Sequence, residues 1–271
     1  MKHRELILIK GAGELASGVA LRLHHAGYRV IMTEVAQPLA VRRTVAFCEA
    51  VPLGEMCVEG VTARRVDNPS AVAAVLDRSE IPVLVDPQAA CIPALRPMAV
   101  IDAIMAKRNL GTRPTDAPAV VALGPGFVAG LDCHAVVETQ RGHFLGRVYY
   151  SGSALPDTGV PAERRGHATD RIVRAPASGI FRAVRTIGEI VSSSTVLGSV
   201  LPGGNGDAES IPVLSLIDGL LRGLVRDGTP VSRNLKIGDV DPVADPERCC
   251  TISDKALSVA GGVLEALLAL Q

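Results

Sequence analysis

Four residues in one short stretch carry side chains that could do acid–base chemistry. His134 and Glu138 lie four residues apart, and Arg141 and His143 follow within the next five positions. Residues four apart on a strand project from the same face, so the imidazole and the carboxylate are expected on one side of a sheet. A histidine, a carboxylate and a guanidinium close together can exchange protons and hold an anion. We therefore predict His134, Glu138, Arg141 and His143 as catalytic residues, although each taken singly is more often a hydrogen-bonded structural residue.

A glycine turn precedes this stretch and is expected to support it. Residues 119–123 form a continuously apolar run, as in a strand buried on both faces of a parallel sheet. Gly124 and Gly126 follow directly, which brings bare backbone to the end of the strand, where parallel sheets bind ligands. We assign both glycines to cofactor binding. No Ser–His–Asp elbow, P-loop or zinc-protease helix motif is present, and no metal site is predicted.

The first 35 residues match the dinucleotide fingerprint. The apolar run 6–9 predicts a strand, helical spacing follows it as far as Gly27, and residues 28–32 predict the next strand. Between strand and helix, Gly11 permits a tight turn, Gly13 lets backbone approach a pyrophosphate, and Ala16 takes the third position. Glu34 ends the second strand, where its carboxylate can accept from ribose hydroxyls. These four residues predict a nucleotide site.

Two observations weaken the nucleotide interpretation. Glu14 lies inside the turn, where its charge would repel a pyrophosphate. A Rossmann-type scaffold can also keep the glycine turn for packing alone. Arg42 and Arg43 either bind a phosphate or form a solvated helix face, and Glu34 favours an unmodified ribose over one with a 2′-phosphate.

These elements predict an α/β protein with a Rossmann-like, mostly parallel sheet. Residues 82–86 predict a further buried strand, and 133–139 with 144–150 a strand pair. The segment 151–169 is polar and rich in proline and glycine, so it marks a boundary. We therefore expect a nucleotide-binding domain over residues 1–168.

An internal repeat follows the boundary. Positions 179, 182, 188 and 191 carry Gly, Arg, Gly and Val, and the same residues recur 40 positions later. Two such hairpin units predict a small biotinyl/lipoyl-like β-barrel, a barrel-sandwich hybrid, over residues 169–250. Residues 201–210 between the copies contain no lysine to carry a swinging arm, so the barrel is expected to be a docking or lid module. An apolar stripe in 251–271 predicts a C-terminal helix that packs on the main body.

The composition excludes several classes of function. The chain has 271 residues, with 28 Lys and Arg against 28 Asp and Glu, and only 3% aromatic residues. Nucleic-acid binding as the main activity is thereby disfavoured. No apolar run reaches the ~18–20 residues of a membrane helix, so we expect no membrane association and a cytoplasmic location. Six cysteines without a CxxC pair indicate reduced thiols.

The chain as a whole resembles the YqeB-type accessory proteins of selenium-dependent molybdenum hydroxylase systems. The stretches that carry the resemblance are IKGAGELASGVALRLHHAGYRV, PLAVRRTVAFCEAV, LGPGFVAGLDCHAVVETQRGHFLGRV and GGVLEALL. The third of these is the most specific. The resemblance implies a role in maturation of a molybdenum hydroxylase, with that apoenzyme as the partner, and a Rossmann domain distantly similar to that of molybdenum cofactor chaperones.

The leading hypothesis combines the two lines of argument. It is an accessory protein that binds a dinucleotide, either NAD(P) or the nucleotide part of a molybdenum cofactor, with a homo-oligomer as one option for its assembly. One alternative is an NAD(P)-dependent oxidoreductase of a small metabolite, which uses the same fingerprint. Another is a non-enzymatic docking scaffold. Whether the chain is an enzyme stays open at this point.

Overall fold

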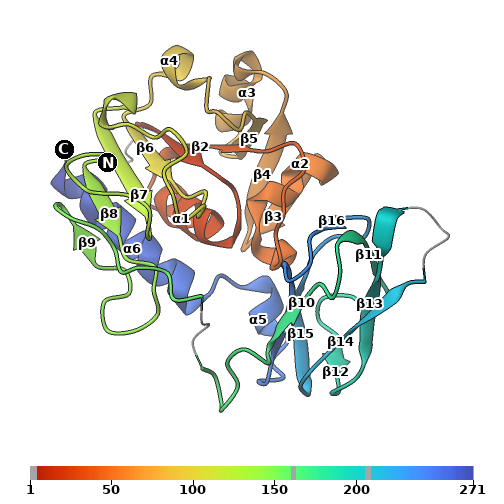
Figure 1. Ribbon diagram of the computed structural model, residues 1–271. Helices are drawn as coiled ribbons and strands as arrows, with labels where there is room; N and C mark the ends of the chain where they lie inside the picture. The colour runs from red at the N-terminus through yellow and green to blue at the C-terminus, as the bar shows by residue number, and fades with distance from the viewer. Residues whose placement is uncertain (1–4, 160–162, 205–208, 271) are drawn as a thin grey trace. The chain divides into compact units, whose positions relative to one another are not determined.

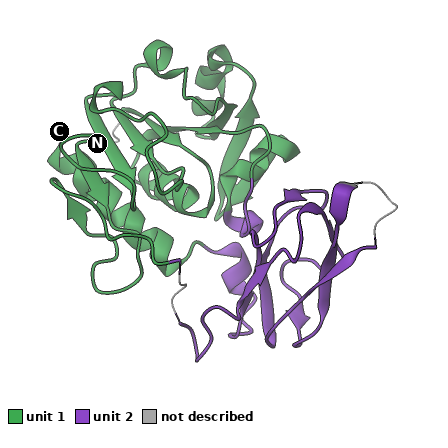
Figure 2. Ribbon diagram, viewed as in Figure 1, with its two compact units in different colours: residues 1–38, 46–158, 252–271 green, residues 39–45, 159–251 purple. Residues whose placement is uncertain are grey.

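The computed structural model describes residues 5–159, 163–204 and 209–270 and consists of two compact units (Figures 1 and 2). Unit 1 comprises residues 1–38, 46–158 and 252–271. Unit 2 comprises residues 39–45 and 159–251. The domain limits expected from the sequence, 1–168 and 169–250, remain a prediction beside this division.

Unit 1 is built on a nine-stranded sheet with the order β3-β4-β5-β2-β1-β6-β7-β8-β9. All strands from β4 to β8 in this order run parallel, whereas β3 and β9 at the two edges run antiparallel to their neighbours. The strand bounds are β1 Leu6–Lys10, β2 Arg29–Glu34, β3 Glu55–Val58, β4 Val61–Val66, β5 Ile81–Val85, β6 Ala99–Asp102, β7 Ala119–Leu123, β8 Ala135–Val137 and β9 Val148–Tyr149.

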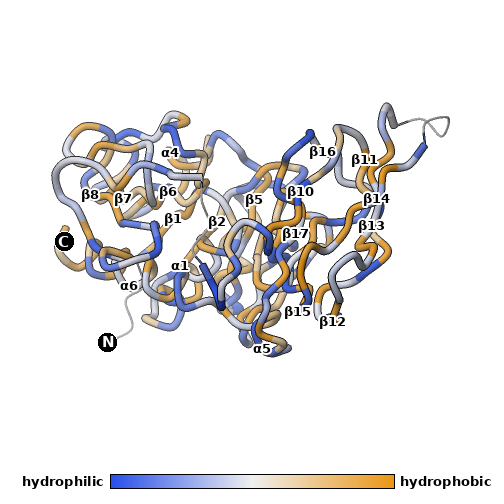
Figure 3. Tube along the Cα trace, turned by 60° about the horizontal axis from the view of Figure 1, so that its bottom comes forward, coloured by the Kyte–Doolittle hydropathy of each residue, from blue (hydrophilic) through white to orange (hydrophobic). Residues whose placement is uncertain are grey.

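The central strands form because their residues are apolar on both faces. Ile7, Leu8 and Ile9 of β1 are completely buried, and every residue of β7 is buried. Strands covered on both faces read as continuous hydrophobic runs rather than alternating ones. Figure 3 shows the hydrophobic residues concentrated along the strands.

The helices of unit 1 differ greatly in length. The long ones are α1 (Glu14–His25) and α6 (Asp254–Ala269), which pack against each other. Gly18 permits this contact, because a Cβ there would lie 2.8 Å from the Cβ of Ala256. The remaining helices are single turns: α2 Ala50–Leu53, α3 Val72–Leu76, α4 Ile92–Leu95 and the 3-10 turns η2 Phe47–Glu49, η3 Pro69–Ala71 and η4 Pro114–Asp116. Among the residues that the structure describes, no helix is long and apolar enough to span a bilayer.

Two adjacent glycines of α6 give a matched stability test. A Cβ on Gly262 would overlap the carbonyl oxygen of Gly146, whereas a Cβ on Gly261 would meet open space. Gly262→Ala should therefore lower the free energy of unfolding by about 1–3 kcal/mol through overpacking. Gly261→Ala should leave it unchanged or raise it by up to about 1 kcal/mol, because alanine favours the helix. Thermal unfolding of the two variants measures both effects, and equal melting temperatures would contradict the packing of α6 described above.

Unit 2 contains two four-stranded antiparallel sheets, in the orders β10-β17-β15-β12 and β14-β13-β11-β16. Their side chains enclose a separate hydrophobic core around Phe181 and Leu197. The strands of the second half begin 40 residues after their counterparts, as Gly179 and Gly219 show. The bounds are β10 Ile172–Arg174, β11 Gly179–Ala183, β12 Ile190–Val191, β13 Val196–Leu201, β14 Ile211–Leu214, β15 Gly219–Leu224, β16 Pro230–Val231, β17 Lys236–Asp241, α5 Glu247–Cys250, η1 Arg43–Val45 and η5 Pro202–Gly204.

The fold class expected from the sequence needs correction. The main sheet is mixed, because residues 55–66 form an antiparallel hairpin that the sequence analysis did not find. Single-turn helices connect several of its strands, where a doubly wound fold would have full crossover helices. The repeat forms two separate four-stranded sheets. The structure is therefore a mixed sheet with additional antiparallel sheets, and not a Rossmann-like domain paired with a biotinyl/lipoyl-like barrel.

Candidate functional site

The strand order of unit 1 singles out one position at the carboxyl ends of the parallel strands. β2 pairs with one side of β1 and β6 with the other, so the connections that leave β1 and β6 diverge. In open parallel sheets, ligands bind outside the carboxyl ends of the strands at such a switch point. Residues at the ends of β1 and β6 are therefore the first candidates for a site.

Three polar side chains meet at this switch point. Lys10 is the last residue of β1, and its Nζ donates to Oγ1 of Thr112 at 2.5 Å. The Thr112 hydroxyl in turn donates to Oδ2 of Asp102, the last residue of β6, at 2.6 Å. The same carboxylate oxygen lies 3.6 Å from the Lys10 ammonium. The side chains are almost fully buried, with exposed fractions of 4% for Lys10, 1% for Asp102 and 2% for Thr112.

A loop over residues 103–113 holds Thr112 in place. Asn109 donates from its side-chain amide to the carbonyl of Thr112 and to Asp132, and its Oδ1 accepts from the Thr112 N–H at 2.8 Å. Met105 and Lys107 of this loop adopt the left-handed conformation at φ values of 63° and 60°. Such a backbone is costly for residues other than glycine and is concentrated at functional sites. The loop is thus a strained segment that follows Asp102 and carries Thr112.

The second glycine turn packs against this loop. Gly126 has a φ of 104°, and a Cβ there would lie 2.5 Å from the backbone nitrogen of Arg108. A Cβ on Gly124 would lie 2.5 Å from Oγ1 of Thr139. The structure therefore accounts for both glycines by close packing with residues of the chain itself. Their assignment to cofactor binding stays a prediction.

The first glycine turn holds a carboxylate from the chain itself. Oε2 of Glu34 accepts from the backbone N–H of Ala12 at 2.9 Å, and its Oε1 accepts from Val35 at 2.8 Å. Burial raises the pKa of Glu34, and the two N–H donors act against that rise. One of the donors expected to face a pyrophosphate is thus occupied. Glu14, also in the turn, accepts a hydrogen bond from Ser253 at 2.8 Å.

Gly13 and Ala16 of the fingerprint differ in their surroundings. A Cβ on Gly13 would meet no atom within 4 Å, so its lack of a side chain is not needed for packing. Ala16 is buried in the first part of α1 and contributes to the core. The Glu34 carboxylate fills part of the turn that contains Gly11 and Gly13, and the assignment of these residues to cofactor binding stays a prediction.

His134 and Glu138 lie at opposite ends of one strand. β8 separates them, and four residues of strand span roughly 13 Å. Nδ1 of His134 accepts from the backbone N–H of Val120 at 2.9 Å. Glu138 is fully buried, and its two oxygens accept from the backbone of Gln140 and Leu155. Each side chain has a bonding partner that ties loops to the sheet.

Arg141 and His143 make their contacts elsewhere. Arg141 forms two hydrogen bonds of 2.8 and 2.7 Å with Asp254 at the start of α6. The exposed His143 ring lies edge-on to Phe144 at a centroid distance of 5.0 Å. The catalytic assignment of the four residues stays a prediction.

Sequence reasoning missed Lys10, Asp102 and Thr112, because they are distant in the chain. A signal was present: a lysine and an aspartate each end a run that is otherwise apolar. Charged residues are rarely buried unless they are paired. Two apolar strands that each end in an opposite charge therefore indicate a buried ion pair at the edge of the sheet.

The cysteines divide into reactive and unreactive thiols. Burial, assisted by Asp86 in one case and Asp132 in the other, raises the pKa of Cys91 and Cys133 to about 12. Cys57 and Cys250 are exposed. Because the thiolate is the nucleophile, maleimide at pH 8 should label Cys57 and Cys250 first, and the buried thiols only after denaturation. Peptide mass spectrometry after short labelling measures this order; early labelling of Cys133 would contradict the burial described.

No group of three potential metal ligands occurs among the described residues.

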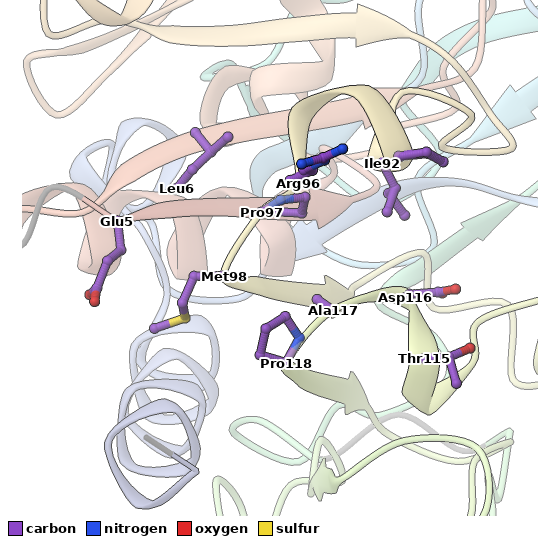
Figure 4. Close-up of a pocket in the computed structure, with 11 residues that line it drawn as sticks. Glu5, Leu6, Ile92, Arg96, Pro97, Met98, Thr115, Asp116, Ala117 and Pro118 are labelled. Carbon is purple, nitrogen blue, oxygen red and sulfur yellow. The ribbon is translucent and has the colours of Figure 1, made fainter.

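A pocket of about 910 Å³ lies at the amino ends of the parallel strands (Figure 4). It is lined mainly by apolar residues where β1, β6 and β7 begin, including Leu6, Met98 and Pro118, with Arg96 from the end of α4. Ligand sites of parallel sheets lie at the carboxyl ends of the strands, so this pocket does not coincide with the switch point.

Two solved structures show a weak likeness to the chain. A succinylglutamate desuccinylase/aspartoacylase from Rhodobacter sphaeroides has a TM-score of 0.29 and 15% identity, over 88% of this chain and 85% of that one. An aspartoacylase family protein from Mesorhizobium loti has a TM-score of 0.30 and 13% identity, over the same shares. Similarities this low transfer no activity to the chain.

The contacts of the first glycine turn correct the function expected from the sequence. Glu34 partly fills the glycine turn. The NAD(P), molybdenum cofactor nucleotide and oxidoreductase interpretations all depended on that turn. The docking scaffold gains no support from these structures. The hydroxylase apoenzyme as a partner and a homo-oligomeric state remain predictions.

The sequence comparison gives a much stronger match. No family model matches the chain. It is 49% identical over 266 residues to the Escherichia coli (strain K12) protein described as "Uncharacterized protein YqeB", a match that covers 98% of this chain and 48% of that protein. The chain thus spans about half the length of this curated relative, whose name does not mention selenium or molybdenum. Over nearly its whole length, the chain is similar to about half of YqeB.

Proposed function

We propose that unit 1 binds a small molecule with a carboxylate or carbonyl oxygen at the β1/β6 switch point and catalyses proton transfer on it. The observation that supports this proposal is the buried chain of hydrogen bonds from Lys10 through Thr112 to Asp102. A proton-transfer site needs a donor and an acceptor held within hydrogen-bond distance of each other and of the substrate.

Lys10 contributes the group that contacts the substrate oxygen. An ammonium has three N–H donors. Among the described residues, Thr112 takes one of them, and the Asp102 carboxylate lies at ion-pair distance. A further N–H is left for a carbonyl or carboxylate oxygen, whose developing negative charge the buried ammonium would stabilise.

Asp102 and Thr112 contribute the proton path. The Thr112 hydroxyl accepts from Lys10 and donates to Asp102, so it connects the cation with the carboxylate. Asp102 is held in position by a second bond, because its Oδ1 accepts from the backbone N–H of Ile104 at 3.1 Å. In this arrangement the Thr112 oxygen takes the proton that leaves the substrate carbon next to the carbonyl. The hydroxyl proton of Thr112 passes to Asp102, which is the final proton acceptor.

Access requires movement of the loop over residues 103–113. The three side chains are buried in the structure, and the loop that carries Thr112 contains Met105 and Lys107 in the left-handed region. Loops that close over substrate exclude water from the reacting atoms. The loop would open for substrate and close again around it.

Deuterium exchange tests the proposal directly. The full chain is incubated in D2O with pyruvate, 2-oxoglutarate or levulinate, and the loss of the protons next to the carbonyl is followed by NMR. We expect faster exchange of at least one compound than in buffer alone. The double variant Lys10→Met/Asp102→Asn removes both charges together, so it avoids an unpaired buried charge. It should reduce the acceleration by about 100-fold or more.

A second double variant is the control. Arg29→Met/Asp77→Asn removes a cation and a carboxylate from an exposed pair of unit 1, 3.4 Å apart, and should leave the exchange unchanged. Absence of acceleration by the native chain would refute the proposal, and so would equal acceleration by the Lys10 double variant. NAD added to the same samples should have no effect.

A further inference from the structure

Unit 2 gathers four arginines around two aspartates of β17. Asp239 and Asp241 have exposed fractions of 1% and 0%. The arginines come from separate parts of the unit: one from β15, one from α5 and two from the residues that precede β10. We call Arg164, Arg171, Arg222 and Arg248 the arginine cluster.

Asp239 is contacted by two members of the cluster. Arg222 donates to its Oδ2 from Nε at 3.0 Å and from a terminal nitrogen at 2.7 Å. A terminal nitrogen of Arg171 lies 3.1 Å from the Oδ1 atom. Lys236 stands further away, at 3.9 Å from the same carboxylate.

Asp241 is contacted by three members of the cluster. Arg164 donates to Oδ2 at 2.7 Å and Arg222 at 3.2 Å, and Arg248 lies 3.6 Å from the same oxygen. Arg222 therefore bridges the two aspartates. All of these cations converge on a region only a few ångströms across.

The positive charge in this region exceeds the negative charge. Four guanidinium groups face two buried carboxylates. A third carboxylate, that of Asp245, is 46% exposed and pairs with Arg248 at the rim, at 3.3 Å. Uncompensated charge in a buried region is expensive unless a counter-ion is recruited.

Arg171 shows the excess most clearly. Its exposed fraction is 8%, and its buried Nε has no hydrogen-bond partner among the described residues. Burial lowers the pKa of Arg171, and the nearby charges of Arg222 and Arg164 lower it further, against the opposing effect of Asp239. Oδ1 of Asp239 is also buried without a hydrogen-bond partner among the described residues, so the network contains an unpaired donor and an unpaired acceptor. The unpaired donor calls for an acceptor that completes it, such as an ion.

We infer that the arginine cluster binds a phosphate-type oxyanion. Guanidinium groups match such anions well, because their planar N–H donors bond two oxygens at once. Arg164 and Arg248 are partly exposed, with side-chain fractions of 23% and 36%, and provide the approach from solvent. The site lies in unit 2 and is independent of the function proposed for unit 1.

Calorimetric titration of the full chain with inorganic phosphate at low ionic strength tests this inference. We expect binding in the native chain and at least a 10-fold weaker affinity for Arg171→Met, which keeps the apolar stem but removes the charge. Arg164→Gln, at a more exposed position, should also weaken binding and guards against a folding defect in the first variant. Arg233→Gln changes an exposed arginine of unit 2 outside the cluster and should bind phosphate like the native chain.

A parallel titration distinguishes two sources of the anion. Glucose 6-phosphate carries the same group on a larger molecule; binding of either compound with the stated dependence on Arg171 and Arg164 supports the site. Circular dichroism of each variant establishes that it is folded. Failure of both compounds to bind the native chain would overturn the inference. So would phosphate binding that neither arginine variant weakens.

Discussion

Lys10→Met is expected to lower the free energy of unfolding of unit 1 by about 3–5 kcal/mol. The variant leaves the Asp102 carboxylate buried without its cation and removes the donor to Thr112. Hydrogen exchange, measured by mass spectrometry on peptides from β1 and β6 in the full chain, gives the size of the effect. Where exchange follows unfolding of the unit, the rates should rise by about two to four orders of magnitude.

The double variant separates the charge from the packing. Lys10→Met/Asp102→Asn removes the unpaired charge, so most of the lost stability should return. The exposed pair of Arg29 and Asp77 is the control, and Arg29→Met should cost less than about 1 kcal/mol. If Lys10→Met and Arg29→Met had similar effects, Lys10 would not be the buried partner of Asp102.

Asp241→Asn is expected to have the second large effect, a loss of about 3 kcal/mol confined to unit 2. The substitution removes the negative charge that Arg164, Arg222 and Arg248 share, and leaves an excess of buried positive charge. Hydrogen exchange on peptides from β15 and β17 should accelerate, while peptides from β1 should not.

The effect of Asp241→Asn should depend on pH. Burial favours the neutral acid, but the Val243 N–H and the charges of Arg164 and Arg222 outweigh it and hold the pKa below the ordinary 3.8. A lowered pKa stabilises the fold above the ordinary value, and the stabilisation is lost as the pH falls through the folded-state pKa. The difference between native chain and variant should therefore be full at pH 7 and shrink below pH 4. Asp227→Asn, in an exposed pair with Arg182, should show a small difference at both pH values.

Several elements could be predicted from the sequence because their signals are local. The apolar run 119–123 coincides with β7, and the stripe of the C-terminal segment coincides with α6. The segments 133–139 and 144–150 contain β8 and β9, which pair as expected. Residues 69–76 form η3 and the short α3 rather than one longer helix.

The fold class and the candidate site depend on distant contacts and could not be predicted in the same way. The antiparallel hairpin of β3 and β4 joins the main sheet because β4 pairs with β5. The residues of the hairpin alone do not specify this pairing. The chain of hydrogen bonds at the switch point joins Lys10 to Thr112 across 102 positions. The glycine fingerprint gave no sign that Glu34 would bond to the turn itself.

The division of unit 1 into three stretches of chain has a consequence for its biosynthesis. Gly18 of α1 packs on Ala256 of α6, and α6 follows unit 2 in the chain. While the ribosome is still adding unit 2, the face of α1 that awaits α6 stays open to water. Nascent chains with such uncovered apolar surface associate readily with chaperones or with each other. Unit 2 must therefore be synthesised before α1 acquires its neighbour, and a stop codon ahead of residue 252 should yield aggregating product rather than a smaller working unit.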